Sequence, residues 1–125
     1  MKIYVAAHCR WAAHYVALVL GYKGHEITSG WIYTDFNPTD QHDETERAGI
    51  AQDDFDDVAR SDALVLVAGP DRYPGGKFVE TGIALGMGKR VVVIGRRENM
   101  LIWLPAIRQV DDPHAAADLL NQEAV

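Results

Sequence analysis

Short apolar runs alternate with helix-like segments along this chain, and the alternation limits its fold more than any other feature. The runs typical of buried strands are Lys2–Ala7, Glu26–Thr34, Ala63–Ala68 and Arg90–Gly95, with a shorter one at Ile107–Val110. Helical spacing of apolar residues marks Trp11–Tyr22, Thr45–Arg60, Lys77–Gly88 and His114–Gln122. Asp112 and Pro113 suit the cap and first position of the last helix. The polar or Pro/Gly-rich stretches Asp35–Glu44 and Gly69–Gly76 are expected to be loops.

Strands that alternate with helices predict a parallel sheet covered on both faces. We expect a three-layer α/β sandwich with a five-stranded, mainly parallel, flavodoxin-like sheet of order 2-1-3-4-5. The length of 125 residues predicts one domain, 1–125. Ligands of such sheets lie beyond the carboxyl ends of the strands, where strands 1 and 3 diverge. That rule directs attention to His8–Trp11, to Gly69–Glu80 and to the residues after Trp31–Tyr33.

Charge and cysteine content exclude several classes of function. Twelve Lys and Arg against eighteen Asp and Glu give a net charge of −6, which is unfavourable for binding a nucleic-acid polymer or an anionic membrane. The single cysteine, Cys9, excludes an internal disulfide or a multi-cysteine zinc site, and no metal site or cofactor is expected. No apolar run reaches the ~18 residues of a membrane span. Without a signal-peptide pattern, we expect a cytoplasmic protein.

The segment Tyr73-Pro-Gly-Gly-Lys-Phe-Val-Glu80 carries the strongest chemical signal. It leaves the most apolar strand, and Gly75 and Gly76 would let a ligand approach the backbone closely. The segment then enters a helix whose first turn is expected to hold Glu80, near the positive end of the helix dipole. A carboxylate held ionised there can attack an anomeric carbon. Alternatively, Glu80 only stabilises the helix terminus.

Further candidate residues occupy the same predicted edge of the sheet. Asp54 belongs to an acidic run but flanks the apolar side of its helix, so it suits proton transfer; the alternative is a solvated acidic face. Tyr4, in the first strand, can be a core tyrosine or can hold Glu80 in place. His8 and Arg10 follow that strand, and the planar fork of Arg10 suits a phosphate, with a surface arginine as the alternative. Trp31 can stack on a base or fill the core.

Known nucleotide-binding motifs do not account for these residues. The turn after the first strand reads Ala6-Ala7-His8-Cys9-Arg10-Trp11 and lacks the G-x-G-x-x-G of dinucleotide folds. The chain also lacks the G-x-x-x-x-G-K-[ST] of a P-loop.

Three blocks resemble the nucleoside 2-deoxyribosyltransferase superfamily, which includes 2′-deoxynucleoside 5′-monophosphate N-glycosidases. They are Lys2-Ile-Tyr-Val-Ala-Ala, Asp54-Phe-Asp-Asp-Val-Ala-Arg-Ser-Asp62-Ala and Gly75-Gly-Lys-Phe-Val-Glu80-Thr-Gly-Ile-Ala-Leu-Gly-Met-Gly-Lys89-Arg-Val. The resemblance covers nearly the whole chain, and the third block is the most specific. The Pro-Gly-Gly stretch is also similar to cytokinin-type phosphoribohydrolases, although their glutamate lies further from the glycines.

The resemblance implies roles for particular residues. Glu80 matches the nucleophile that attacks C1′, Tyr4 the tyrosine that positions it, and Asp54 the acid that helps the base depart. The substrate would be a small-molecule nucleoside or nucleotide, and a homo-oligomer is expected because neighbouring subunits often complete the site. Transferases of the family carry Asp where this chain has Pro74. A hydrolase is therefore as compatible as a transferase, and Gly75, Gly76 and Arg10 suit a 5′-phosphate. The competing hypothesis is a non-catalytic nucleotide-binding or sensing module on the same fold.

Overall fold

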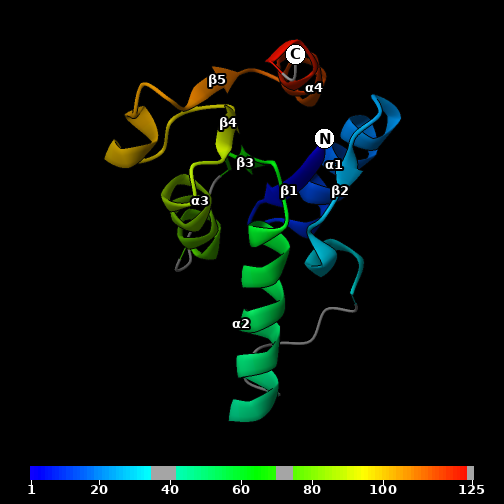
Figure 1. Ribbon diagram of the computed structural model, residues 1–125, viewed down its shortest axis with the longest axis vertical. Helices are drawn as coiled ribbons and strands as arrows, with labels where there is room; N and C mark the ends of the chain where they lie inside the picture. The colour runs from blue at the N-terminus through cyan, green and yellow to red at the C-terminus, as the bar shows by residue number, and fades with distance from the viewer. Residues whose placement is uncertain (35–41, 70–74, 124–125) are drawn as a thin grey trace.

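A computed structural model describes residues 1–34, 42–69 and 75–123, so most of both predicted loops lies outside the described residues. Five strands form one parallel sheet of order β2-β1-β3-β4-β5. The strands are β1 Lys2–Ala6, β2 Glu26–Ile27, β3 Ala63–Val67, β4 Arg90–Ile94 and β5 Arg108–Val110. The predicted strand order is confirmed, and so is the α/β architecture (Figure 1).

Helices cover both faces of the sheet, as continuous apolar strands require. The helices are α1 Arg10–Tyr22, α2 Glu44–Ala59, α3 Gly76–Gly86 and α4 Pro113–Glu123, with short 3₁₀ helices η1 Gly30–Tyr33 and η3 Met100–Trp103. One core cluster joins α1 and α4 to the odd-numbered side chains of β1. The other joins α2, α3 and η3 to Tyr4 and Ala6 of the same strand. At the start of α4, Ala115 N donates to Asp112 Oδ1 at 2.8 Å, which confirms the predicted cap.

The strand predicted at 26–34 is wrong beyond Ile27, because side chains replace the strand backbone along β1. Val5 N donates to Ser29 Oγ at 3.0 Å, and Trp31 Nε1 donates to Val5 O at 3.1 Å. Gly30 N donates to Asp57 Oδ2 of α2 at 3.1 Å. With these groups satisfied by side chains, the chain turns into η1 instead of extending the ladder. Trp31 is thereby fixed beside the carboxyl half of β1.

Helix α2 also departs from the prediction, although its bounds are close to those expected. Ala48, Ala51, Phe55, Val58 and Ala59 share an apolar side, but only Val58 is buried. Figure 1 shows the helix running out past the sheet, with its last turns against β1 and β3. Its first turns are therefore held by helix-local forces, including the cap in which Glu46 N donates to Asp43 Oδ1 at 2.8 Å. No described helix has the length and apolar character needed to cross a membrane.

Candidate active site

The candidate nucleophile and the tyrosine expected to position it meet beneath the carboxyl edge of the sheet. Tyr4 is fully buried in β1, and its hydroxyl donates a hydrogen bond to Glu80 Oε2 on α3. The partners are 76 residues apart in the sequence, so the fold alone brings them together. Alternation along β1 turns Tyr4 toward the face that α3 covers. The contact fixes one carboxylate oxygen of Glu80 and leaves the other available.

Glu80 lies deeper in its helix than predicted, and its charge state differs accordingly. Helix α3 begins at Gly76, so Glu80 falls in the second turn, and the helix has no acidic residue in its first. The dipole effect acts within the first turn and does not hold this carboxylate ionised. Instead, burial raises the pKa of the Glu80 carboxyl to about 8. The free protein therefore keeps Glu80 largely protonated at neutral pH.

Asp54 faces the same side of the sheet from α2. It lies one helical turn before Val58, which packs in the cluster that contains Tyr4. The side chain is half-buried, and the pKa of Asp54 rises to about 6 through burial, then through the charges of Asp57 and Asp53. Asp53 and Asp56 are exposed, so the solvated-face interpretation holds for them and not for Asp54. Helices α2 and α3 are in contact, which sets the two raised-pKa carboxyls on adjoining helices.

The remaining predicted residues frame the carboxyl edge without all meeting one another. Arg10 and Trp31 do meet, since Arg10 Nη2 donates to the Trp31 carbonyl at 3.2 Å. Arg10 is half-buried, whereas His8 is exposed in the turn after β1, next to the exposed Cys9. Trp31 is partly buried against both core clusters, so it fills the core and also borders the edge.

Gly75 and Gly76 turn out to have different structural reasons to be glycine. A Cβ on Gly75 would lie 2.5 Å from Cδ2 of Phe78, so the Phe78 ring excludes any side chain there. A Cβ on Gly76 would have no neighbour within 4 Å. Gly76, the first residue of α3, therefore presents open space at the helix N-terminus, where an anion is favoured.

A buried ion pair that the sequence analysis missed holds this helix in place. Lys77 Nζ donates to Glu98 Oε1 at 2.8 Å and to the Val67 carbonyl at 3.1 Å. Only 1% of the Lys77 side chain and 12% of the Glu98 side chain are exposed. Gly69 N also donates to Glu98 Oε1, at 3.3 Å. The pair joins the end of β3 to the first turn of α3, one turn before Glu80.

Among the described residues, no three His, Cys, Asp or Glu side chains are grouped as metal ligands would be. The arrangement offers acid–base and nucleophilic chemistry from carboxyl groups. A carboxyl that can attack carbon and a second that can deliver a proton are the components of a retaining glycosidase.

Removing the Tyr4 hydroxyl should impair this arrangement. Tyr4→Phe leaves Glu80 buried without its donor, which disfavours the ionised form and raises the pKa of Glu80 further. We expect turnover to fall about 10–100-fold and the ionisation seen in the rate profile to move to higher pH. Tyr22→Phe removes an equivalent hydroxyl from an exposed position and should change neither quantity. An unshifted profile in Tyr4→Phe would show that Tyr4 does not tune Glu80.

No protein-family model and no curated protein matches this sequence. Solved structures, by contrast, match this chain along nearly its whole length. The CMP N-glycosidase BcmB of Clostridium botulinum aligns with a TM-score of 0.64 and 19% identity over 98% of this chain and 99% of that one. A 2-deoxyribosyltransferase of Bacillus psychrosaccharolyticus aligns with a TM-score of 0.74 and 19% identity over 94% of this chain and 91% of that one. The chain thus has, along nearly its whole length, the fold of enzymes that act on nucleosides or nucleotides, which confirms the resemblance at the level of the fold.

Proposed function

We propose that this protein cleaves or transfers at the N-glycosidic bond of a 2′-deoxynucleoside or its 5′-monophosphate. The observation that carries the proposal is the buried pairing of Tyr4 with Glu80 beneath the carboxyl edge of the sheet. The shared fold supports it, because the structural neighbours include an N-glycosidase of CMP and a 2-deoxyribosyltransferase.

In the proposed reaction, the Glu80 carboxylate attacks C1′ and forms a glycosyl ester. The C1′–N bond breaks, and its electron pair stays on the base, which takes a proton from the Asp54 carboxyl. Water, or the nitrogen of a second base, then attacks C1′ and releases the Glu80 carboxylate, while the Asp54 carboxylate accepts the proton. The open N-terminus of α3 at Gly76 and the Arg10 guanidinium are the groups we propose for a 5′-phosphate.

A panel of nucleosides and nucleotides tests the proposal directly. The protein is incubated with each compound, and free base is followed by chromatography. Free base with free sugar indicates hydrolysis, whereas a new nucleoside formed after a second base is added indicates transfer. Higher kcat/KM for 5′-monophosphates than for nucleosides supports the phosphate site. If every compound stays intact, the proposal is wrong.

One observation favours a second candidate, a non-catalytic nucleotide-binding module. A Glu80 carboxyl with a pKa of about 8 is mostly protonated at pH 7 and can donate a hydrogen bond to a ligand. In that case ligand binds tightly but remains intact after long incubation, and Glu80→Gln changes only the affinity. The base-release assay separates the two candidates.

The two raised pKa values predict an unusual pH profile. The attack requires ionised Glu80 and protonated Asp54, with pKa values of about 8 and about 6. Near pH 7 only ~1% of the free protein has this combination. We expect kcat/KM to rise with pH to about 6, stay level to about 8, and fall above it.

Asp54→Asn supplies the control for this profile. With only Glu80 left to titrate, kcat/KM should climb until about pH 8 and then level off without an alkaline fall. Loss of general acid catalysis costs ~10²–10⁴-fold, but the active fraction rises from ~1% in wild type to nearly all of the variant. The plateau of the variant should therefore lie between the wild-type maximum and a value ~100-fold below it. A variant that keeps the wild-type profile would remove Asp54 from proton transfer.

A further inference from the structure

The segment 28–31, which leads from β2 into η1, is held in place by two side chains from the end of α2. Asp57 Oδ2 accepts a hydrogen bond from Gly30 N at 3.1 Å. The other carboxylate oxygen, Asp57 Oδ1, lies 3.2 Å from Arg60 Nε. Arg60 Nη2 in turn donates to the Thr28 carbonyl at 2.9 Å. The backbone of this segment is therefore bound to α2 at two points.

The contact between Asp57 and Gly30 is close and largely shielded from water. Only 19% of the Asp57 side chain is exposed, whereas Asp53 and Asp56 of the same helix are exposed. A Cβ on Gly30 would lie 3.2 Å from Asp57 Oδ2, a tighter approach than most Cβ atoms make. A hydrogen bond from a backbone N–H to a carboxylate is stronger than one between neutral groups. Asp57 is therefore a structural anchor and not a member of the solvated acidic face.

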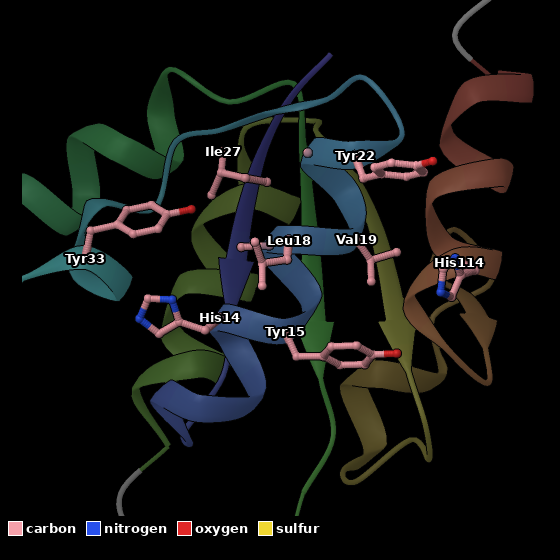
Figure 2. Close-up of a pocket in the computed structure, with 10 residues that line it drawn as sticks. His14, Tyr15, Leu18, Val19, Tyr22, Ile27, Tyr33 and His114 are labelled. Atoms are coloured by element: carbon pink, nitrogen blue, oxygen red, sulfur yellow. The ribbon is translucent and has the colours of Figure 1, made fainter.

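The other side of the segment meets α1 and the proposed phosphate ligand. The Trp31 carbonyl accepts a hydrogen bond from Arg10 Nη2 at 3.2 Å. Tyr33, at the end of η1, packs edge-on against His14 of α1, with ring centroids 5.6 Å apart (Figure 2). Because Trp31 follows Gly30 directly, the bond to Asp57 limits where the Trp31 carbonyl can lie. It thereby limits where the Arg10 guanidinium can lie.

Asp57 also acts on Asp54, which lies three residues earlier on the same helix. The pKa of Asp54 is raised by burial, then by the charge of Asp57, and then by that of Asp53. Among the described residues, the other titratable groups on elements packed against α2 are Lys77 and Glu80 of α3 and Tyr33 of η1. Burial and the two neighbouring aspartates therefore account for the raised pKa of Asp54.

We propose that Asp57 is a positioning residue that ties the 28–31 segment to α2 and thereby prepares both Arg10 and Asp54 for the proposed reaction. Its bond to Gly30 sets the backbone that holds Arg10 toward a 5′-phosphate. Its negative charge favours the protonated Asp54 carboxyl that the departing base requires. The inference rests on the proposed function and deepens it, because it assigns a role to a residue that does not touch substrate.

Two substitutions of Asp57 separate the backbone effect from the charge effect. Asp57→Asn keeps an oxygen that can accept from Gly30 N but has no charge, whereas Asp57→Ala has neither. We expect both variants to move the acid limb of the kcat/KM profile below pH 6 and to lower its plateau, by up to about tenfold for each pH unit of the shift. Only Asp57→Ala should also raise KM for 5′-monophosphates, about tenfold, without raising it for nucleosides.

Asp56→Asn is the matched control for both variants. It removes an equal charge from an exposed position of the same helix, where the carboxylate contacts only Gln52 of α2 among the described residues. It should change neither the acid limb nor KM.

Titration of the free protein gives a readout that needs no turnover. The carboxyl carbon of Asp54 and the amide of Gly30 are followed by NMR from about pH 4 to pH 9. We expect Asp54 to titrate near pH 6 in wild type and in Asp56→Asn, and at lower pH in Asp57→Asn. The Gly30 amide should exchange with solvent faster in Asp57→Ala than in wild type or Asp57→Asn.

The outcomes separate this proposal from the proposed function. A wild type that releases no base would overturn the proposed function, while the NMR titration would still decide the role of Asp57. An Asp54 carboxyl that titrates at the same pH in Asp57→Asn and wild type would overturn the proposal, and so would an unchanged KM for 5′-monophosphates in Asp57→Ala. If Asp57→Ala fails to fold, Gly30→Ala crowds the carboxylate without removing its charge. Gly30→Ala should raise the same KM without moving the acid limb, and an unchanged KM would overturn the proposal.

Discussion

Glu80→Gln should lower base release at least ~10³-fold, because the amide cannot displace the base from C1′. The substitution removes the nucleophile while leaving the local geometry unchanged. Glutamine keeps the volume of the side chain and can still accept the hydrogen bond from Tyr4. A loss of rate with an unchanged structure would therefore show that the reaction needs the carboxylate itself. Free base is measured with wild type, with the variant and with Glu26→Gln, which changes an exposed glutamate and should leave the rate unchanged.

Stability against denaturant provides the folding control for Glu80→Gln. The wild-type carboxyl has a pKa raised from 4.5 to about 8 in the folded state, so the folded protein binds the proton more tightly than the unfolded chain. Wild-type stability therefore falls as pH rises through that window, and the variant lacks this loss. At pH 8 the variant should unfold at the same or a higher denaturant concentration. A folded, stable variant with wild-type activity would exclude Glu80 as the nucleophile.

Lys77→Met should destabilise the fold by about 3–5 kcal/mol, the usual cost of removing one partner from a buried ion pair. The change leaves the Glu98 carboxylate almost fully buried without the ammonium 2.8 Å away. It also removes the donor to the Val67 carbonyl. Because the pair positions the first turn of α3, we expect base release to fall as well. Denaturant unfolding at pH 7 measures the free energy.

Two further variants show whether the Lys77 effect comes from the buried charge. Adding Glu98→Gln to Lys77→Met should recover part of the lost stability, because the uncompensated carboxylate is then neutral. Lys23→Met breaks an exposed pair, in which Lys23 Nζ lies 3.3 Å from Asp118 Oδ1, and should cost less than ~1 kcal/mol. Equal losses for Lys23→Met and Lys77→Met would contradict the assigned role of the pair.

The sheet could be predicted from the sequence because its signals are local. Each strand from β1 to β4 other than β2 is a continuous apolar run, and Asp112 with Pro113 marks the start of α4. Strand β2 was overpredicted because long-range bonds end it: Ser29 Oγ and the Trp31 indole take backbone groups of Val5 that a longer strand would have used. No local pattern reports such contacts.

Parts of the candidate site were predictable to different extents. The motif around Glu80 and the position of Tyr4 led to a pair that the structure joins directly. The prediction that the helix terminus holds Glu80 ionised was wrong. The pKa of Glu80 depends on burial by distant segments and not on its position in the helix. Glu98 was missed because it lies 21 residues from Lys77, outside every motif, and becomes significant only when the fold buries both charges.

Trapping the covalent intermediate tests the central claim most directly. Wild-type protein is mixed with a substrate identified in the base-release panel, quenched with acid within one turnover, digested and analysed by mass spectrometry. The account predicts one deoxyribosyl or deoxyribosyl-phosphate group on the peptide that contains Glu80, in amounts that match the first burst of free base, and none in Glu80→Gln. Free base released by wild type with the sugar attached to a different residue, or with Glu80→Gln equally active, would contradict it.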